Sequence, residues 1–309
     1  ASAMDNAKAE HGRPSLISLR TIIAWPAPTL QNTGKSHGSA LGADEVAATK
    51  TAMGMDPAQD FAVSPQVLDH VRQVKSRGAV AHSEWQATFD AWQQAHPDRV
   101  ALLDRLVAQE LPADLADALP RFDPSKPMAT RKASGECINA IAAVMPEFWG
   151  GSADLAESNL TTIEGGGSFL PATSQAPGKT PYGRILHFGI REHAMGAALN
   201  GIAVGGLTRP FGGTFLVFSD YMRGAVRLSA LMQAPVTYVW THDSIGLGED
   251  GPTHQPVEHL TALRAMPGLD VVRPADANET AVCWLQVLRN RRPAGLALTR
   301  QNVPTLDPD

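Results

Sequence analysis

Residues 241–256 read THDSIGLGEDGPTHQP and place two histidines and three acidic residues around three glycines. The glycines have the G-x-G-x-x-G spacing of loops that bind the diphosphate of a dinucleotide. Two carboxylates inside that spacing, Glu249 and Asp250, would repel a diphosphate, and Pro252 has no N–H to donate to it. The residue types therefore argue against a dinucleotide-binding loop.

His242 and His254 of the same loop match no compact zinc-ligand spacing. Imidazoles titrate near neutral pH and hydrogen-bond hydroxyls, carbonyls and phosphates, so with Asp250 they suit a polyhydroxylated or phosphorylated substrate. A surface loop whose polar side chains hydrogen-bond its own backbone would explain the same residues equally well. The local sequence leaves both interpretations open.

The elements that must position this loop alternate between strands and helices over residues 127–309. Short β-rich runs are predicted at 148–154, 184–188, 214–217, 236–240, 271–273 and 295–299, with helices at 130–144, 192–204, 221–232, 256–264 and 279–290. This alternation predicts an α/β fold with a parallel sheet that is covered by helices on both faces.

In such a sheet, ligands bind at the carboxyl ends of the strands. Charged and aromatic side chains are concentrated in the loops that follow the predicted strands. The candidates in these loops are Asp154, Ser158, Arg191, Glu192, His193, the runs 218–223 and 242–254, and Arg300.

Two further zones precede this one. Residues 1–42 begin like the end of a helix from something larger and contain one predicted strand, Ser15–Ile23, whose partners must lie elsewhere. Residues 43–126 are predicted to be a helical connector, and we interpret its tryptophans as core packing. The helices expected in this connector span 43–53, 65–75, 83–95 and 97–109.

Composition narrows the functional classes. A net charge of −5 and a pI near 6.1 provide no basic face for a nucleic acid. The longest nearly uncharged stretch, Ala194–Leu207, is too short to span a membrane, and the first residues lack the apolar run of a secretory signal. Cys137 and Cys283 have no metal-ligand spacing around them and are interpreted as buried thiols in a reducing cytoplasm.

Several long motifs together resemble one enzyme family, the transketolases. The opening loop is one of them, and the same register extends through SLISLRTIIAWPAP and SHGSALG near the start of the chain. The other motifs are RKASGECINA (131–140), GGSADLAESNLT (150–161), GIREHAMG (189–196), GGTFLVFSDY (212–221) and RPADANE (273–279). The resemblance covers essentially the whole chain.

The resemblance implies a particular domain plan. Transketolases have a diphosphate-binding, a pyrimidine-binding and a C-terminal domain, and this sequence resembles the tail of the first (1–42), a connector (43–126) and the complete second (127–309). The family's GDG…N signature, which holds the metal and the diphosphate, is absent from this sequence. We therefore expect a piece of a longer enzyme, or one subunit of a split enzyme, without the C-terminal domain.

The same plan implies how the cofactor is held. Thiamine diphosphate is expected as cofactor, with Mg²⁺ or Ca²⁺ bound by a domain missing from this chain and no metal ligand in the chain itself. The complete enzyme is expected to be a cytoplasmic homodimer, or to need a separate diphosphate-binding chain. Neither a membrane nor a nucleic acid is an expected partner.

Glu192 resembles the carboxyl group that hydrogen-bonds the pyrimidine ring nitrogen of the cofactor and stabilises its imino tautomer. Without the family, it would be a glutamate that the helix dipole favours at a helix start. Phe215, Phe218 and Tyr221 share a face if their segment is helical, and the resemblance makes them the pyrimidine pocket. Phe218 is the expected direct stacking partner.

The remaining site residues resemble substrate contacts. The phosphate end is expected to meet Arg131, Ser158, His242 and Arg300, since arginine grips phosphate oxygens with two hydrogen bonds. The sugar hydroxyls and the carbonyl end are expected to meet Asp250 and His254. His37 is expected to be an active-site histidine contributed by the tail of the first domain.

The implied reaction is reversible transfer of a two-carbon ketol unit from a ketose phosphate to an aldose phosphate, as in the pentose phosphate pathway or the Calvin cycle. A dihydroxyacetone synthase shares this chemistry, and a 1-deoxyxylulose-phosphate synthase is a weaker match to the GLGEDGPTHQP loop. The alternative from another class is a catalytically silent fragment or binding subunit that needs a separate diphosphate-binding chain.

Overall fold

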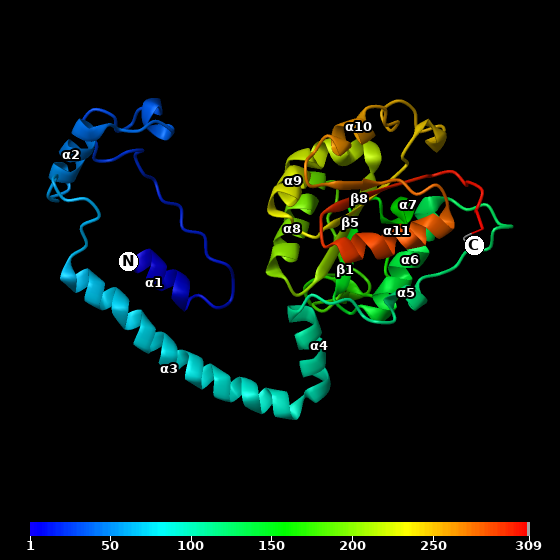
Figure 1. Cartoon of the computed structure of the whole chain (residues 1–309), viewed down its shortest axis with the longest axis horizontal. Coiled ribbons are helices and arrows are strands. Elements are labelled where there is room, and N and C mark those ends of the chain that lie inside the picture. Colours follow the sequence, from blue (N-terminus) through cyan, green and yellow to red (C-terminus); the bar gives the residue numbers. More distant parts are fainter. Residues whose placement is uncertain (308–309) are drawn as a thin grey trace. The chain divides into compact units, whose positions relative to one another are not determined.

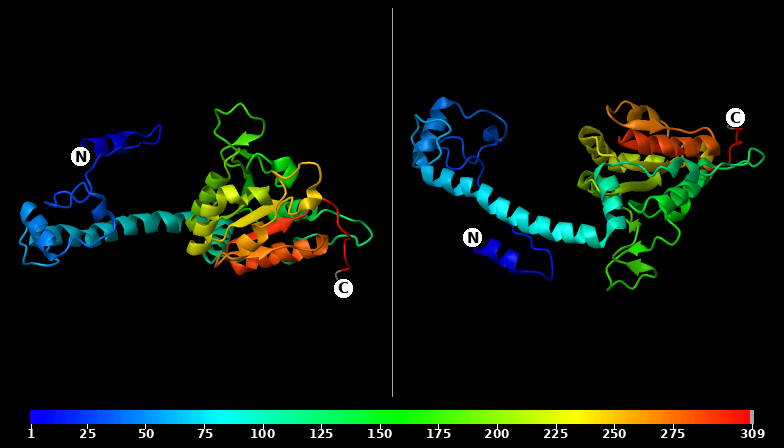
Figure 2. Two further views of the ribbon diagram at one scale, coloured as in Figure 1. Left: turned by 90° about the horizontal axis from the view of Figure 1, so that it is seen from above. Right: turned by 60° about the horizontal axis from the view of Figure 1, so that its bottom comes forward.

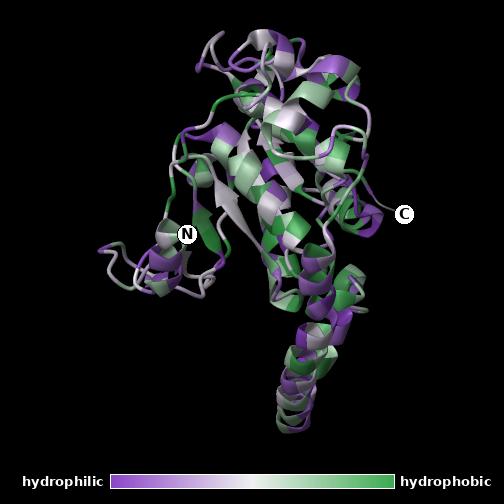
Figure 3. Ribbon diagram, turned by 90° about the vertical axis from the view of Figure 1, so that its left-hand side faces the viewer, coloured by the Kyte–Doolittle hydropathy of each residue, from purple (hydrophilic) through white to green (hydrophobic). Residues whose placement is uncertain are grey.

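The computed structural model describes residues 1–307 of the chain. The chain divides into two compact units, Ala1–Ala91 and a second unit that begins at Trp92, and each is described by itself. The helices of the chain carry both hydrophilic and hydrophobic residues, as Figure 3 shows. Among residues 1–307, no helix combines the length and the apolar character that crossing a membrane requires.

The first unit is helical and has little interior. It contains helices α1 (Ser2–Ala9) and α2 (Ala43–Ala52), the short 3-10 helix η1 (Gly34–His37) and most of α3 (Pro65–Ala95). Among the described residues of this unit, only Ala27 is buried. Its structure is therefore maintained by local hydrogen bonds more than by a core.

Two expectations for this unit are wrong. Ser15–Ile23 is not a strand: it forms no ladder with any described segment, the carbonyls of Ile22 and Ile23 accept only local hydrogen bonds from the turn that follows, and Leu16 is 96% exposed. The helices expected at 65–75 and 83–95 are one continuous helix, α3. A single glycine in the middle, Gly78, costs a helix only about 1 kcal/mol, which is too little to break it.

The second unit is built on an eight-stranded sheet in which every neighbouring pair is parallel (Figure 1). The strand order is β3-β2-β4-β1-β5-β6-β8-β7. This arrangement confirms the predicted parallel sheet. The strands are β1 (Phe148–Ser152), β2 (Ser168–Phe169), β3 (Lys179–Thr180), β4 (Ile185–His187), β5 (Arg209–Phe215), β6 (Thr237–Thr241), β7 (Asp270–Val272) and β8 (Ala294–Leu298).

Helices cover both faces of this sheet, as predicted (Figure 2). One apolar core lies under α5 (Leu115–Ala118), α6 (Thr130–Val144) and α11 (Ala277–Asn290), and the other under α8 (Glu192–Gly205), α9 (Ser219–Met232) and α10 (His259–Arg264). Val239 of β6 belongs to the first core, and its neighbours Tyr238 and Trp240 belong to the second. Successive strand residues point to opposite faces, so β6 is buried on both.

The central strand β5 begins earlier than the expected run at 214–217. It starts at Arg209, and all seven of its residues are buried between β1 and β6. Pro210 and two glycines lower the strand propensity of this segment, which explains why the pattern missed it. After Phe215 the chain leaves the sheet in the 3-10 helix η2 (Leu216–Phe218).

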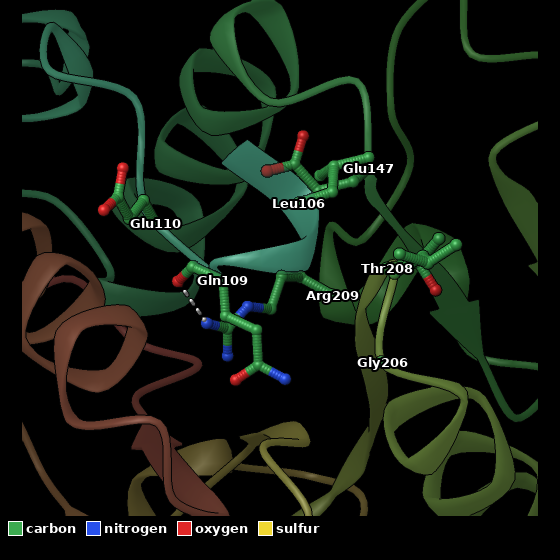
Figure 4. A pocket seen from close by; sticks show the side chains of 8 residues that line it. Leu106, Gln109, Glu110, Glu147, Gly206, Thr208 and Arg209 are labelled. Atoms are coloured by element: carbon green, nitrogen blue, oxygen red, sulfur yellow. Dashed lines mark hydrogen bonds between the residues drawn. The ribbon is translucent and has the colours of Figure 1, made fainter. Parts of the chain in front are cut away.

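At the amino edge of the sheet, an ion pair links α4 (Pro97–Val107) to the loop before β1. Arg105 donates from Nη1 and Nη2 to the two carboxylate oxygens of Glu147, at 2.7 and 2.9 Å, and this pairing raises the pKa of the arginine. Beside it lies a cavity of about 10 Å³, shown in Figure 4, where Arg209 donates to the Gln109 carbonyl at 3.5 Å. The space is too small for a ligand, so we interpret this edge as structural.

Replacing Glu147 by glutamine should remove the charge from this pair and leave Arg105 without its two-oxygen partner. We expect Glu147→Gln to lower the free energy of unfolding by about 2 kcal/mol, the typical contribution of hydrogen bonds between charged groups. Urea titration of both chains measures the loss. The exposed Glu136, on α6, provides the matched control Glu136→Gln; equal stability of the two variants would contradict the assignment.

Candidate active site

The parallel register brings the carboxyl ends of β1, β5, β6 and β8 to one edge of the sheet. Ser152 at the end of β1 lies opposite Gly213 of β5, Phe215 lies opposite Thr241 of β6, and Thr241 lies opposite Leu298 of β8. The loops that follow these strands carry most of the predicted site residues. Their side chains can therefore meet although they are far apart in the sequence.

Three aromatic rings form a stack after β5. The ring centroids of Phe215 and Phe218 are 5.8 Å apart with an interplanar angle of 6°, and those of Phe218 and Tyr221 are 5.7 Å apart at 21°. Phe215 is buried, Phe218 is half-buried and Tyr221 is 66% exposed. The stack thus runs from the interior to the surface and can offer a flat apolar face to a ring.

Both histidines of the loop after β6 lie against this stack. The imidazole of His242 is parallel to the ring of Phe215, with centroids 3.6 Å apart. His254 presents its edge to Phe218 at 5.3 Å and to Phe215 at 6.0 Å. The loop 241–256 therefore lies against the aromatic pocket. Its short helix η3 (Ile245–Leu247) turns the chain between the two histidines.

His242 is uncharged at neutral pH in this position. Its side chain is buried, and its Nδ1 lies 2.8 Å from the hydroxyl oxygen of Thr241. Burial, reinforced by the positive charges of Arg131 and Arg300, lowers the pKa of His242 to about 4. The loop therefore contributes a neutral imidazole to the site.

Two arginines supply positive charge beside the histidines. Arg131, at the start of α6, donates to the backbone carbonyl of Ser158 in α7 (Ala156–Asn159), and its Nε has no hydrogen-bond partner among the described residues. Burial, and then the charge of Arg300, lowers the pKa of Arg131. Arg300 lies 3.6 Å from the exposed carboxylate of Glu249. This cationic pair has hydrogen-bonding capacity left for an anion.

The other predicted residues take different positions. Glu192, the first residue of α8, is buried where the chain returns from β4. Ser158 is half-buried, and Asp250 is exposed on the loop after β6. His37 lies exposed in η1 of the first unit. The second unit thus gathers the aromatic rings, His242, His254, Arg131 and Arg300, while the roles of Asp250 and His37 stay predictions.

A cavity of about 490 Å³ opens at the same edge, after β1 and β4. Asp154, Ser158 and Arg191, all predicted from strand ends, line it together with Ser152. Asp154 has a φ of 61°, the left-handed region, so the chain turns sharply as it leaves β1. The cavity is large enough for a small organic ligand.

Sequence reasoning missed the buried polar residues behind the site. Ser152, Asn159 and Thr241 form a hydrogen-bonded chain that ends at His242. Ser152 and Asn159 both lie in the motif GGSADLAESNLT, and small polar residues directly after a buried strand were the available signal. The contact between Asn159 and Thr241 has no such signal in the sequence, because these residues are 82 positions apart.

Comparisons with known proteins agree with this geometry. Residues 126–305 match the family model of the transketolase pyrimidine-binding domain, and residues 1–112 match that of the transketolase thiamine diphosphate-binding domain. The parallel sheet thus lies in the part of the chain that matches the pyrimidine-binding domain. The chain belongs to the transketolase family.

Individual relatives extend over the whole chain. It is 60% identical to the transketolase of Mycobacterium leprae and 51% identical to that of Geobacillus stearothermophilus, and each alignment covers 99% of this chain. The chain spans 44% and 45% of the lengths of these two proteins.

Solved structures are similar over the same extent. The complex of Pichia stipitis transketolase with sedoheptulose 7-phosphate superimposes with a TM-score of 0.92 at 42% identity, covering 100% of this chain and 46% of that one. Transketolase from Leishmania mexicana has the same TM-score at 39% identity, with 100% and 45% covered. Both the sequence motifs and the fold therefore place this chain among the transketolases.

The low pKa of His242 predicts how stability depends on pH. Between about pH 6.5 and pH 4 the unfolded chain binds a proton that folded His242 does not, so the stabilisation is complete above pH 6.5 and is lost as the pH falls toward 4. We expect His242→Gln to lose less unfolding free energy over this window than the unchanged chain. Urea titrations at several pH values measure the slope, with the exposed His70→Gln as control; identical slopes for all three chains would contradict burial of the neutral ring.

Proposed function

We propose that this chain provides the pyrimidine side of a transketolase active site. The proposed reaction is reversible transfer of a two-carbon ketol unit from a ketose phosphate to an aldose phosphate. The observation that carries it is one juxtaposition: the stack of Phe215 and Phe218 lies against two histidines, within electrostatic range of Arg131 and Arg300. A flat apolar pocket beside a cationic pair fits a heteroaromatic cofactor ring next to a phosphorylated sugar.

The residues present fit the pyrimidine ring of thiamine diphosphate. The half-buried face of Phe218 suits stacking, and Phe215 and Tyr221 extend the stack inward and outward. Glu192 is a buried carboxyl group at the same edge of the sheet, and it is the proposed hydrogen-bond partner of the ring nitrogen. Thiamine diphosphate supplies the nucleophilic carbon that carries the two-carbon unit.

The proposed substrate contacts form two groups, one for the phosphate and one for the sugar. Arg131, Ser158, His242 and Arg300 are the proposed phosphate contacts, and the two arginines donate to the phosphate oxygens. Asp250 and His254 are the proposed contacts of the sugar hydroxyls and the carbonyl end, and His37 is proposed as an active-site histidine from the tail of the diphosphate-binding domain. In all of these roles the chain's residues bind and orient the substrate and exclude water from it.

A second domain is needed in this proposal to hold the diphosphate of the cofactor. The diphosphate and its Mg²⁺ or Ca²⁺ bind a diphosphate-binding domain, either in a homodimer of the complete enzyme or on a separate chain, in the cytoplasm. Residues 1–42, 43–126 and 127–309 are proposed as the tail of that domain, the connector and the pyrimidine-binding domain. Acceptor choice distinguishes a transketolase from a dihydroxyacetone synthase.

The decisive experiment measures ketol transfer from xylulose 5-phosphate to ribose 5-phosphate with thiamine diphosphate and Mg²⁺. The chain is assayed alone and together with a separately produced diphosphate-binding domain. We expect activity in the combined sample. If the combined sample is inactive although it binds thiamine diphosphate, the catalytically silent alternative is supported instead.

In the same assay, Glu192→Gln tests the proposed acid. Glutamine keeps the size of the side chain but cannot hold an exchangeable proton at the ring nitrogen, so we expect activity to fall by at least about 100-fold, a typical contribution of proton transfer. Glu136→Gln, at an exposed position in α6, is the matched control and should keep its activity. Wild-type turnover in Glu192→Gln would eliminate this role.

Arg131→Ala tests the proposed phosphate contact. Charge-assisted hydrogen bonds of about 1.5–3 kcal/mol correspond to a rise in KM of roughly 10- to 150-fold for a phosphorylated donor. An unphosphorylated donor should be affected much less, because it presents no phosphate to the missing guanidinium. Arg264→Ala, at the exposed end of α10, is the control; equal effects of Arg131→Ala on both donors would refute the phosphate role.

A further inference from the structure

Behind the aromatic pocket, four buried hydrogen bonds link the backbone of β5 to the ring of His242. The Ser152 hydroxyl oxygen lies 2.7 Å from the Gly213 carbonyl oxygen and 2.5 Å from Asn159 Nδ2. Asn159 Oδ1 lies 2.6 Å from the hydroxyl oxygen of Thr241, which lies 2.8 Å from His242 Nδ1. None of these side chains is more than 4% exposed, so bulk water does not compete for their protons.

The backbone carbonyl fixes the direction of the first two bonds. A carbonyl oxygen can only accept, so the Ser152 hydroxyl donates its one proton to Gly213. Ser152 must then accept from Asn159, which turns the NH₂ group of the amide toward Ser152. The orientation of the amide thus follows from the network.

The direction continues to the imidazole. With its NH₂ group facing Ser152, Asn159 presents its carbonyl oxygen to Thr241, and the Thr241 hydroxyl donates to it. Thr241 has no second proton, so its oxygen accepts from His242, and Nδ1 must carry the hydrogen. The ring is neutral at pH 7, because burial and the neighbouring arginines lower the pKa of His242, so Nε2 is left with a lone pair.

The free nitrogen is open to the site. No described residue is hydrogen-bonded to Nε2 of His242, and this atom is not one of the fully buried atoms that lack a partner. The ring is held in place by stacking on Phe215 at 3.6 Å. Nε2 is therefore not fully buried, and its lone pair is left to accept a hydrogen bond from a ligand.

We propose that Asn159 and Thr241 are positioning residues that fix His242 in the Nδ1–H tautomer, so that its Nε2 accepts a hydrogen bond from the ligand. A ligand atom at Nε2 must then bring its own proton, as a sugar hydroxyl or a singly protonated phosphate oxygen does. A fully ionised phosphate has no proton for Nε2 and must take its hydrogen bonds from donors such as Arg131 and Arg300 beside it. The tautomer is independent of the proposed function, whereas the identity of the ligand rests on it.

The structure also explains why residue 213 is a glycine. A Cβ at this position would lie 2.8 Å from Thr161 Cγ2, 3.3 Å from Asn159 Nδ2 and 3.4 Å from Ser152 Oγ. The side chains of the hydrogen-bonded chain occupy the space that a larger residue would need. The close approach leaves Asn159 little freedom to turn its amide.

The test is the ¹⁵N spectrum of the 309-residue chain labelled at histidine, near pH 7, where a protonated and an unprotonated ring nitrogen give well-separated signals. His242→Gln identifies the signals of His242. We expect Nδ1 of His242 to be protonated and Nε2 unprotonated in the unchanged chain. The Nε2–H tautomer, or an imidazolium, would overturn the proposal.

Two substitutions of Thr241 and one control separate positioning from simple stability. Thr241→Val removes the acceptor at Nδ1 at nearly constant volume, so the two tautomers should mix, whereas Thr241→Ser keeps the hydroxyl and should restore the Nδ1–H form. Thr214→Val is the matched control: Thr214 is equally buried in β5, and its hydroxyl has no partner among the described residues. Unchanged signals in a folded Thr241→Val chain would overturn the role of Thr241.

Titration with two probes identifies the source of the proton. Displacement of the Nε2 signal by inorganic phosphate indicates a phosphate hydroxyl, and displacement by an unphosphorylated ketose indicates a sugar hydroxyl. If neither displaces it at saturating concentration, the ligand contact is overturned while the tautomer assignment is judged on its own spectrum. Failure of the ketol-transfer assay would leave that spectrum unaffected, so the two proposals can fail separately.

Discussion

The parallel pairing of β5 with β1 and β6 is the constraint on which the rest of the second unit depends. Every residue of β5 is buried. The neighbouring strands β1 and β6 run in the same direction as β5, so all three strands end at one edge of the sheet. This register brings Ser152 level with Gly213 and Phe215 level with Thr241. A slip of one residue would turn Phe215 to the opposite face and separate it from His242.

The charges at this edge are divided between groups of different chemistry. Arg131 and Arg300 carry the positive charge at this edge, and a guanidinium can donate hydrogen bonds to an anion. His242, pressed against Phe215 between them, is driven neutral by burial and by their charge. In the proposed function, one end of the ligand meets this positive charge while a neighbouring atom meets the acceptor, a contrast that suits a molecule with both phosphate and hydroxyl groups.

The sequence predicts elements best where the signal is local. The helix at 130–144 has the predicted bounds, because its apolar period and its breaks lie within one stretch of chain. Signals that depend on other segments fail: Ser15–Ile23 has the composition of a strand but no neighbour to pair with, and β5 is a central strand despite Pro210. Strand formation needs a partner, so its evidence lies partly outside the segment itself.

For the site, the sequence by itself determined the residue types, the family resemblance and the loops that follow the strands. It could not show that Asn159 meets Thr241 or that Ser152 meets the Gly213 carbonyl, because these contacts join residues 82 and 61 positions apart. Only the tertiary structure decided which nitrogen of His242 carries the proton. The physical reason is that a backbone carbonyl can only accept, and it gives a direction to a chain of hydrogen bonds only when folding brings its members together in a space closed to water.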